Sequence, residues 1–530
     1  MLIVGFENSS IDKNTQIVKD IQQYDLGGVI LFDRYYTDPN RTKNISSPQQ
    51  LKILTNKLQS FSKKPLFISV DQEGGKVARL KPKYGFRTIP SAKELAKLPE
   101  KEARKIYKEQ SLMLKEAGIN LNFAPVVDLA INPKNSVIYG LKRSFSKDST
   151  IVSKYATLLI EEQSKQNIVS VIKHFPGHGS SLGDSHKGFV DITQTWSKEE
   201  LQPYNILIKK NDVDMIMTAH VYNAKLDSKY PATLSYNINT KLLRQEMHYR
   251  GVIISDDLQM SAISKHYTLK ERLKLAINSG VDILLFGNQL ANVSVSELVD
   301  AIYSQVKEGS IPLEKIIQAN RRIENLHTKN SIIQRAIKFS TQRKAMTQEY
   351  IYKHYGLKVS NVTIDPKIIV LHWTAVMSFE DSFKRLYGEK LYSDRGDIAS
   401  ASALNVSAHF LIKRDGTIYQ LMPDNFMARH VIGLNYSSIG VENIGGEDNA
   451  KDDLTEAQLQ ANIQLVKYLK AKYPQIEYLI GHHEYLEMES NPLWLERDKN
   501  YRTIKADPGE RFMSDVRNAV ISLGFKKADE

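Results

Sequence analysis

The sequence contains no cysteine among its 530 residues. Disulfide bonds, a thiol nucleophile and thiolate metal sites are therefore excluded, and a bound metal ion would need ligands from histidine, aspartate or glutamate. The chain also lacks an apolar run of about 18 to 20 residues, the length that a helix needs to cross a bilayer. We therefore expect a protein without a membrane span, and its length suggests two to four domains.

Charge of one sign is not concentrated anywhere, although the formal net charge is +12 at pH 7. The basic residues are scattered and often stand beside acids, as in KEEL and LKERLK, and the sequence shows neither a long basic run nor a nucleic-acid motif. This distribution favours a solvated surface, and we expect no nucleic-acid partner. DNA binding through this charge would instead show a steep dependence on salt concentration.

The first ten residues, MLIVGFENSS, have neither the charged segment nor the small-residue cleavage site of a signal peptide. We therefore expect the chain as given to be cytoplasmic. A leader already trimmed from the sequence would instead place the protein in the periplasm or envelope.

Short apolar, β-branched runs recur through about the first 290 residues, and helix-period segments such as SPQQLKILTNKLQSF lie between them. Continuous apolar runs suit strands that are buried on both faces of a parallel sheet. Eight repeats of a strand followed by a helix predict an α/β fold, a (β/α)₈ barrel of the TIM type. The expected strands cover residues 1–6, 27–32, 65–71, 120–128, 168–175, 213–220, 251–257 and 281–287.

Polar residues stand at the ends of five of these runs, namely Asp71, Asp128, His174, His220 and Asp256. In a barrel of this kind the carboxyl ends of the strands carry the active site. Each of these residues could instead cap the helix that follows it. Five polar residues on one rim favour an active site.

The segment KHFPGHGSSLGDSHK gathers three histidines around one acid. His174 and His178 have the four-residue spacing of zinc ligands on a helix, but the proline and glycines around them oppose a helix, so this pattern does not favour a metal site. Asp184 and His186 lie two residues apart. A carboxylate beside an imidazole can orient the ring and raise its basicity, which makes His186 either a candidate proton carrier or an ordinary surface histidine.

After about Leu326 the sequence pattern changes. A charged helical stretch leads to mixed elements, among them an Asp-Gly turn typical of a hairpin and a capping box that opens a helix at Thr455. The expected division is a barrel over 1–335, a helical linker over 336–364 and a smaller mixed α/β domain over 365–530.

Several motifs of the first part stand in the order found in one enzyme family. GGVILFDRYYTDP, VDQEGGKVARL, NFAPVVDL, KRSF, KHFPGH and ISDDLQM together resemble the family 3 glycoside hydrolases of the β-N-acetylglucosaminidase, or NagZ-like, type. The resemblance implies a retaining mechanism through a covalent glycosyl intermediate. Most retaining glycosidases use two carboxylates, whereas this family is implied to replace one of them by a His–Asp pair.

The same resemblance implies roles for individual residues. Asp256 matches the nucleophile, with Asp257 as the second choice, and His186 matches the general acid and base, polarised by Asp184. A surface ion pair is the alternative role for Arg79. The residues implied to bind N-acetylglucosamine are Asp71, Arg79, Arg143, Lys173 and His174.

The second part resembles the zinc-dependent N-acetylmuramoyl-L-alanine amidases of the AmpD and peptidoglycan-recognition type, through VLHWTA, NVSAHFLIKRDGTIYQLMP, ARHVIGLN, SIGVEN, LIGHHEY and KADPG. A catalytic zinc typically takes three protein ligands and one water, and the resemblance implies His372, His482 and Asp507 as the ligands. Glu442 matches the general base, and Lys505 matches the residue that stabilises the oxyanion.

Some positions stay open. His483 is an alternative to His482 as a ligand, and His409 and His430 either line the cleft or pack in the core. The last two implied ligands are 25 residues apart (507 − 482), because the stretch NPLWLERDKNYRT is inserted between them. We expect this insert to shape the peptide side of the cleft.

These inferences predict a bifunctional hydrolase of cell-wall turnover, whose partners are peptidoglycan fragments that carry N-acetylmuramic acid or its 1,6-anhydro form. The barrel would release N-acetylglucosamine without a cofactor. The second domain would use Zn²⁺ to cleave the bond between the muramic lactyl group and L-alanine. The alternatives are a second domain that only binds peptidoglycan, and a broader exo-glycosidase that acts on chitin fragments.

Overall fold

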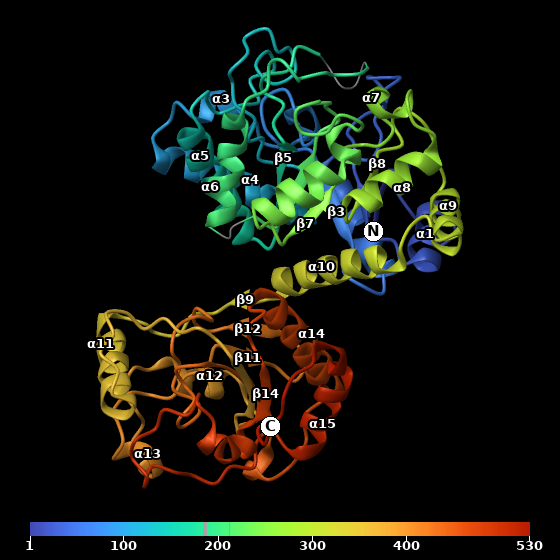
Figure 1. Cartoon of the computed structure of the whole chain (residues 1–530). Helices are drawn as coiled ribbons and strands as arrows, with labels where there is room; N and C mark the ends of the chain where they lie inside the picture. The colour runs from blue at the N-terminus through green and yellow to red at the C-terminus, as the bar shows by residue number, and fades with distance from the viewer. Residues whose placement is uncertain (184–187, 211–212) are drawn as a thin grey trace. The chain divides into compact units, whose positions relative to one another are not determined.

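The computed structural model describes residues 1–183, 188–210 and 213–530 (Figure 1). These residues form two compact units, Met1–Asn330 and Ser331–Glu530. Each unit has its own clusters of buried apolar side chains. Within the described residues, no helix is both long enough and apolar enough to cross a bilayer.

Eight parallel strands form the sheet of the first unit, in the order β7-β6-β5-β4-β3-β2-β1-β8. A bridge between Ile254 and Ile283 joins the two end strands, so the sheet curls into a barrel. All eight expected strands are present, which confirms the predicted (β/α)₈ fold. The strands are β1 Leu2–Gly5, β2 Gly28–Ile30, β3 Phe67–Val70, β4 Leu121–Asn122, β5 Val169–Phe175, β6 Met215–Thr218, β7 Val252–Ile254 and β8 Leu284–Phe286.

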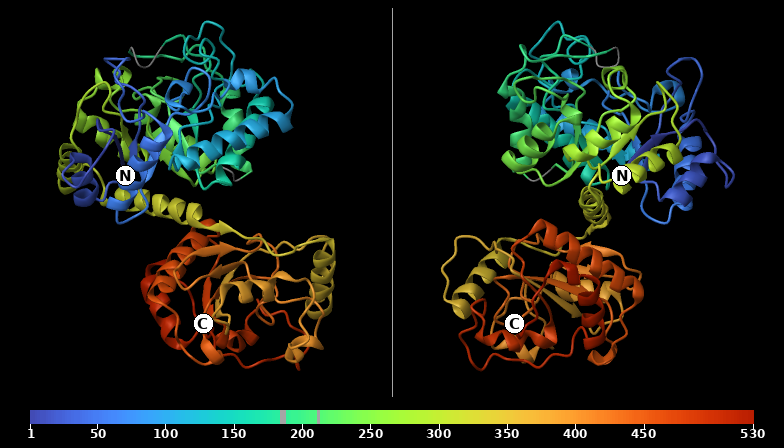
Figure 2. Two further views of the ribbon diagram at one scale, coloured as in Figure 1. Left: turned by 180° about the vertical axis from the view of Figure 1, so that it is seen from behind. Right: turned by 45° about the vertical axis from the view of Figure 1, so that its right-hand side comes forward.

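Helices surround these strands, as the views in Figure 1 and Figure 2 show. Local sequence sets several of their ends: Thr268 and Glu271 form the capping box that opens α8, and Gly280, with φ of 105°, ends it. The helices are α1 Gln16–Tyr24, α2 Pro48–Phe61, α3 Ala92–Leu95, α4 Glu100–Glu116, α5 Ser149–Ser164, α6 Gln202–Lys209, α7 Ser261–Ser264, α8 Leu269–Ser279, α9 Val295–Lys307 and α10 Leu313–Ser331, with shorter 3₁₀ segments η1 Pro82–Tyr84, η2 Lys198–Leu201 and η3 Ala232–Leu234 and the π-helical η4 Asn237–Glu246.

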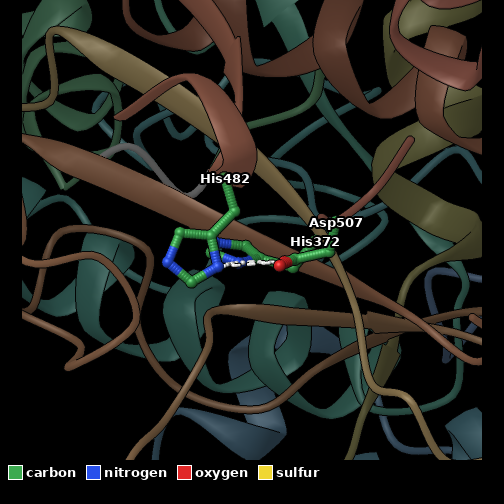
Figure 3. A group of neighbouring side chains, drawn as sticks. All are labelled: His372, His482 and Asp507. Carbon is green, nitrogen blue, oxygen red and sulfur yellow. Dashed lines mark hydrogen bonds and ion pairs between the residues drawn. The ribbon is translucent and has the colours of Figure 1, made fainter. Parts of the chain in front are cut away.

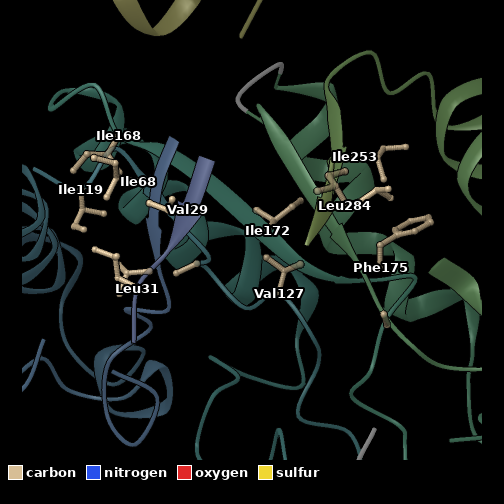
Figure 4. Close-up of a cluster of buried hydrophobic side chains, with 14 of the residues drawn as sticks. Val29, Leu31, Ile68, Ile119, Val127, Ile168, Ile172, Phe175, Ile253 and Leu284 are labelled. Carbon is tan, nitrogen blue, oxygen red and sulfur yellow. The ribbon is translucent and has the colours of Figure 1, made fainter. Parts of the chain in front are cut away.

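The barrel strands are buried on both faces because successive side chains point to opposite sides of a strand. Ile3 and Val171 belong to a cluster to which every strand contributes, and this cluster fills the barrel interior. Val4 and Ile172 belong to the larger cluster between the sheet and the helices, part of which Figure 4 shows. The continuous apolar runs of the sequence therefore reflect two packed layers.

The second unit has a six-stranded sheet in the order β14-β10-β13-β11-β12-β9. β10 lies parallel to both β13 and β14, whereas β11 and β12 form the antiparallel hairpin that the Asp-Gly turn predicts. The expected smaller α/β domain is thus confirmed. The strands are β9 Ile333–Gln334, β10 Ile368–Trp373, β11 Phe410–Ile412, β12 Ile418–Gln420, β13 Ser438–Asn443 and β14 Tyr478–Gly481.

Helices of the second unit include α14, which begins at the predicted capping box of Thr455 and Gln458. The helices are α11 Thr341–Tyr350, α12 Phe379–Tyr387, α13 Gly396–Ala399, α14 Glu456–Lys472 and α15 Glu510–Ala519, with the π-helical η5 Ile351–Tyr355 and the 3₁₀ segments η6 Glu447–Asn449, η7 His482–Ser490 and η8 Ile521–Leu523.

Alternation along the central strand β10 decides which way its side chains point. Ile369 and Leu371 pack in the cluster that contains side chains of α14 and α15. Ile368 and Val370 pack in a separate cluster on the opposite face. His372 continues this second series, so it points away from α14 and α15.

The segment 336–364, predicted as a helical linker, belongs to the second unit. It contains α11 and η5, and the side chains of Tyr350, Ile351 and Tyr355 pack in the same cluster as strand residues of β10. The guanidinium of Arg343 is buried and donates to the main-chain carbonyl of Gly388 at 2.7 Å. This segment therefore covers one face of the sheet.

A buried carboxylate, that of Asp282, connects the elements around β7 and β8, where the sheet closes into a barrel. The Asp282 carboxylate, 0% exposed, accepts from the guanidinium of Arg244 at 2.6 Å, from that of Arg322 at 2.9 Å, and from the backbone N–H of Ile253 at 2.8 Å. The Asp282 side chain thus links η4, β7 and α10 to the segment that leads into β8.

We expect Asp282→Ala to lower the free energy of unfolding of the first unit by about 3–5 kcal/mol, because two arginines lose a buried partner. Of the three tryptophans in the chain, only Trp196 lies in the first unit, so a Trp373→Phe, Trp494→Phe background lets its fluorescence report urea unfolding of that unit. The control is Glu109→Ala, which removes an exposed pair with Arg87 and should cost less than about 1 kcal/mol. Equal losses in the two variants would contradict this account.

Candidate active sites

A cavity of about 580 Å³ lies at the carboxyl ends of the barrel strands. The predicted general acid His186 and its partner Asp184 lie outside the described residues. The six other residues implied for the sugar site all line this cavity: Asp71, Arg79, Arg143, Lys173, His174 and Asp256.

Asp71 directly follows β3 and is held by two cations. Its carboxylate accepts from the Lys173 ammonium at 2.9 Å and from the Arg79 guanidinium at 3.2 Å. Burial alone would raise the pKa of the Asp71 carboxyl, but the charges of Lys173 and Arg79 outweigh burial, and its pKa falls well below the ordinary value. Asp71 is therefore ionised at neutral pH and can accept hydrogen bonds from sugar hydroxyls.

Glu73 forms the centre of a second charged group. Arg143 donates to both of its carboxylate oxygens at 2.8 Å, in a bidentate pair. The Lys173 ammonium also lies 2.7 Å from a Glu73 oxygen, so this lysine bridges Asp71 and Glu73. The pairing leaves no buried charge uncompensated in this group and fixes the directions of Lys173 and Arg143.

Asp128 orients His174. Its Oδ2 lies 2.7 Å from His174 Nδ1, and its Oδ1 accepts the backbone N–H of His178 at 2.8 Å. The Arg143 guanidinium lies 3.3 Å from His174 Nε2 and can only donate. His174 therefore carries its proton on Nδ1 and presents the Nε2 lone pair to Arg143.

Asp256 and Asp257 follow β7, and both line the cavity. Asp257 Oδ1 accepts the backbone N–H of Gln259 at 3.0 Å, and Oδ2 lies 2.6 Å from where a Cβ at Gly287 would be. Asp257 thus packs against main chain. His220 Nε2 lies 2.9 Å from the carbonyl oxygen of Asp257 and donates to it, which holds the turn that carries both acids.

Glu200 supports the loop that follows β5. Its buried carboxylate accepts the backbone N–H of Gly179 at 2.8 Å and that of Ser180 at 3.3 Å. Gly177, with φ of 117°, lies so close that a Cβ there would come within 2.5 Å of Glu200. Burial raises the pKa of the Glu200 carboxyl to about 7.

The second unit has a cavity of about 470 Å³. Three predicted side chains converge there from the ends of β10 and β14 and from the loop before α15 (Figure 3). His372 Nδ1 lies 3.0 Å from His482 Nδ1 and 3.1 Å from Asp507 Oδ2, and the latter two atoms are 3.0 Å apart. All three side chains are buried, with exposed fractions of 1%, 8% and 5%. The group has the composition and spacing of a metal site.

Glu442 and Lys505 line the same cavity. Glu442 pairs in register with His372 on the neighbouring strand β13, so both side chains point to the same face of the sheet. Within the described residues its Oε2 is buried and has no hydrogen-bond partner, and burial raises the pKa of its carboxyl to about 7. Burial also lowers the pKa of the Lys505 ammonium.

The structure distinguishes between the alternatives that the sequence left open for four histidines. His482 joins the three-residue group, whereas His483 bonds to the main-chain carbonyl of Asp507 and lines a different hollow. His409 is fully buried, and its two ring nitrogens contact the main chain of Gly440 and Phe426. His430 instead lines the cavity and lies 3.0 Å from His372.

Sequence reasoning missed Glu73 and gave Asp128 no role in the site. Glu73 stands two residues after Asp71 in the motif VDQEGG, and this second acid was the available signal. Asp128 was noted only as a polar residue at a strand end. Their partners lie far away in sequence, which a pattern in one segment does not reveal.

Both cavities present buried acids, bases and hydrogen-bond donors of the kind that hydrolases use. Residues 2–326 match the glycosyl hydrolase family 3 N terminal domain, and residues 362–510 match the N-acetylmuramoyl-L-alanine amidase family. Because the first match covers more than half of the chain, the chain belongs to glycosyl hydrolase family 3. It joins a glycoside hydrolase domain to an amidase domain, as the motifs predicted.

Individual relatives agree with this assignment. The chain is 34% identical over 339 residues to a beta-hexosaminidase A of Pseudoalteromonas piscicida, covering 58% of this chain and 54% of that protein. It is 31% identical over 357 residues to a beta-hexosaminidase of Idiomarina loihiensis, covering 66% and 98%.

Among solved structures, a glycoside hydrolase family 3 beta-N-acetylglucosaminidase of Paenibacillus sp. str. FPU-7 is similar in fold, with a TM-score of 0.56 and 23% identity. The likeness covers 100% of this chain and 92% of that one.

The pKa of Glu200 predicts a pH-dependent stability. The folded chain keeps a proton on this carboxyl up to about pH 7, whereas the unfolded chain loses it near 4.5, so stability falls as the pH rises through this window. Glu200→Gln removes the ionisable carboxyl and with it this decrease in stability at higher pH. We expect the melting temperature of this variant, relative to wild type, to increase between pH 5 and pH 8. A matched control is Glu199→Gln, because that neighbouring side chain is exposed. A constant difference for Glu200→Gln would contradict the prediction.

Proposed function

We propose that this chain is a bifunctional peptidoglycan hydrolase, in which the first unit removes N-acetylglucosamine and the second cleaves the amide between N-acetylmuramic acid and L-alanine. The observation that supports the proposal is that the expected residues within the described part of the chain converge in two separate cavities, one in each unit. The names of the related hexosaminidases support the first activity, and the amidase family supports the second.

In the first site Asp71, Lys173 and His174 would hold the sugar through its hydroxyl and acetamido groups. Asp256 would attack the anomeric carbon while the bond to the leaving oxygen breaks, and His186, polarised by Asp184, would give that oxygen its proton. Water would then attack the anomeric carbon and displace Asp256, while His186 takes a proton from this water. The configuration at the anomeric carbon is retained by these two displacements.

In the second site His372, His482 and Asp507 fit a zinc ion. Zinc prefers nitrogen and oxygen ligands at about 2.0–2.2 Å in a tetrahedron, whose edges are then about 3.3 Å. The three donor atoms lie 3.0 to 3.1 Å apart. When bound, zinc would supply a Lewis acid that polarises the amide carbonyl and acidifies water.

The chain's own groups would complete the reaction in the second site. Glu442 has a buried oxygen without a partner among the described residues and a pKa of about 7, so it can take a proton from the attacking water and pass it to the leaving amine nitrogen. Lys505 would stabilise the negative charge that develops on the carbonyl oxygen. A domain that only bound peptidoglycan would not need a base beside three metal ligands.

The two cleavages would act on opposite sides of one muramic acid residue, which makes turnover and recycling of cell-wall fragments the role we propose. Tethering two sites raises the effective concentration of the second for a product of the first. A broader exo-glycosidase would turn over chitobiose as fast as a disaccharide peptide with 1,6-anhydro-N-acetylmuramic acid, so comparing these two substrates separates the alternatives.

Single substitutions should disable the two sites independently. With one defined disaccharide peptide as substrate, we expect Asp256→Asn to reduce sugar release on the order of 10⁴-fold while peptide release stays at the wild-type rate. Glu442→Gln should reduce peptide release about 10²- to 10⁴-fold and leave sugar release intact. Mass spectrometry of the products measures both rates. Normal peptide release by Glu442→Gln would reject its role as the base.

Metal removal should affect only the second activity. We expect dialysis against a strong chelator to abolish peptide release, because the three ligands lose the ion that polarises the amide, and sugar release to persist. Adding back Zn²⁺ should restore peptide release, whereas Mg²⁺, which prefers oxygen ligands, should not. Peptide release that survives complete removal of metal would contradict the proposed chemistry.

A further inference from the structure

His372 has two ring nitrogens in different surroundings. Nδ1 faces His482 and Asp507, whereas Nε2 lies 3.0 Å from Nδ1 of His430. A histidine that ligates a metal usually donates its other N–H to a carboxylate, a main-chain carbonyl or water. Here the neighbouring group is a second imidazole, which accepts only if its own proton sits on the far nitrogen.

The contacts of Ser438 set the position of that proton. The Ser438 hydroxyl lies 2.8 Å from the carbonyl oxygen of Leu434 and donates to it, because a carbonyl can only accept. The same hydroxyl oxygen lies 3.1 Å from His430 Nε2 and therefore accepts from it. His430 Nδ1 is then a lone pair, and it accepts the N–H of His372 Nε2. The lone pair of His372 Nδ1 is left to face the metal site.

His430 is held in place by its surroundings. The side-chain oxygen of Asn435 accepts the backbone N–H groups of His430 and Val431, both at 2.8 Å. A Cβ at Gly440 of β13 would come within 2.6 Å of the His430 ring, so the ring packs directly on this glycine. The imidazole thus has a fixed position beside His372.

The insert between His482 and Asp507 braces the same loop. The backbone N–H of Leu495 donates to the carbonyl of Gly433 at 2.9 Å, and Trp494 packs where a Gly433 side chain would lie. Tyr501 accepts from the guanidinium of Arg429, next to His430, at 2.9 Å. The insert, which we expected to shape the peptide side of the cleft, therefore supports the loop that carries His430.

We propose that His430 is a positioning residue of the second site, which fixes the proton of His372 on Nε2 and so directs the Nδ1 lone pair to the metal. The hydrogen-bond chain runs from the Leu434 carbonyl through Ser438 and His430 to His372. This inference rests on the proposed zinc site, and it concerns how tightly that site holds the ion.

The test is the Zn²⁺ affinity of the full chain, measured by competition with a chromophoric chelator. His430→Ala removes the acceptor and should weaken binding about 10- to 100-fold. His430→Asn places an amide oxygen near the position of Nδ1 and should keep the affinity within about threefold of wild type. With Co²⁺ in place of Zn²⁺, the visible absorption bands should change in the alanine variant and stay close to wild type in the asparagine variant.

Circular dichroism will show whether His430→Ala folds. If it does not, substitutions of Ser438 and Ser437 test the same hydrogen-bond chain. Ser438→Ala removes the hydroxyl that fixes the tautomer of His430 and should weaken Zn²⁺ binding severalfold. Ser437→Ala is the matched control, because its hydroxyl donates to the same Leu434 carbonyl at 3.2 Å but does not bond to His430. Equal affinities in these two variants, or a folded His430→Ala with wild-type affinity, would overturn the proposal. A wild-type chain that binds no Zn²⁺ would instead remove the proposed zinc chemistry itself.

Discussion

Charge pairing below the rim of the barrel makes the first site possible. A carboxylate taken out of water without a partner costs several kcal/mol, yet Asp71 and Glu73 both lie just beyond the carboxyl end of the buried strand β3. Lys173 bridges the two acids, and Arg79 and Arg143 each bind one of them. The same contacts that compensate burial also fix the donors and acceptors, so a sugar would meet groups that are already oriented.

The second site brings two histidine rings and one carboxylate together in a buried cavity. Two ring nitrogens and one carboxylate oxygen lie about 3 Å apart there, a spacing that fits the proposed zinc ion. The hydrogen bonds from Leu434 through Ser438 to His430 would decide which nitrogen of His430 and of His372 carries the proton. In the first unit, ion pairs orient the buried polar groups. In the second unit, we propose that hydrogen bonds to the histidine rings do so.

The sequence was sufficient for the fold and for most of the candidate site residues that line the two cavities. Continuous apolar runs reflect strands that are buried on both faces, and polar residues at the ends of these runs are brought together because parallel strands end on the same rim. Motif order then identified both domains. The roles of Asp256, His186 and Glu442 stay predictions, since chemistry is not visible in a fold.

What the sequence did not show depends on contacts between distant segments. Asp128 meets His174 across 46 residues and His430 meets His372 across 58, and no local pattern encodes such pairs. The covering role of residues 336–364 was missed for a related reason. This stretch is charged overall, and only the packed structure shows that Tyr350 and Tyr355 pack in the same cluster as β10.

Successive side chains of β10 point to opposite faces of the sheet. This alternation limits where the amidase domain can accept insertions and deletions. Inserting or deleting one residue between Ile368 and His372 would turn the His372 side chain to the face that α14 and α15 cover, so a change of length inside the strand would disrupt the site. The 25 residues from His482 to Asp507 contain no strand, so a change of length there would not alter which face of the sheet a ligand occupies. Insertions in loops cost little stability, so we expect new surface around this site to arise in such loops while the strand lengths stay constant.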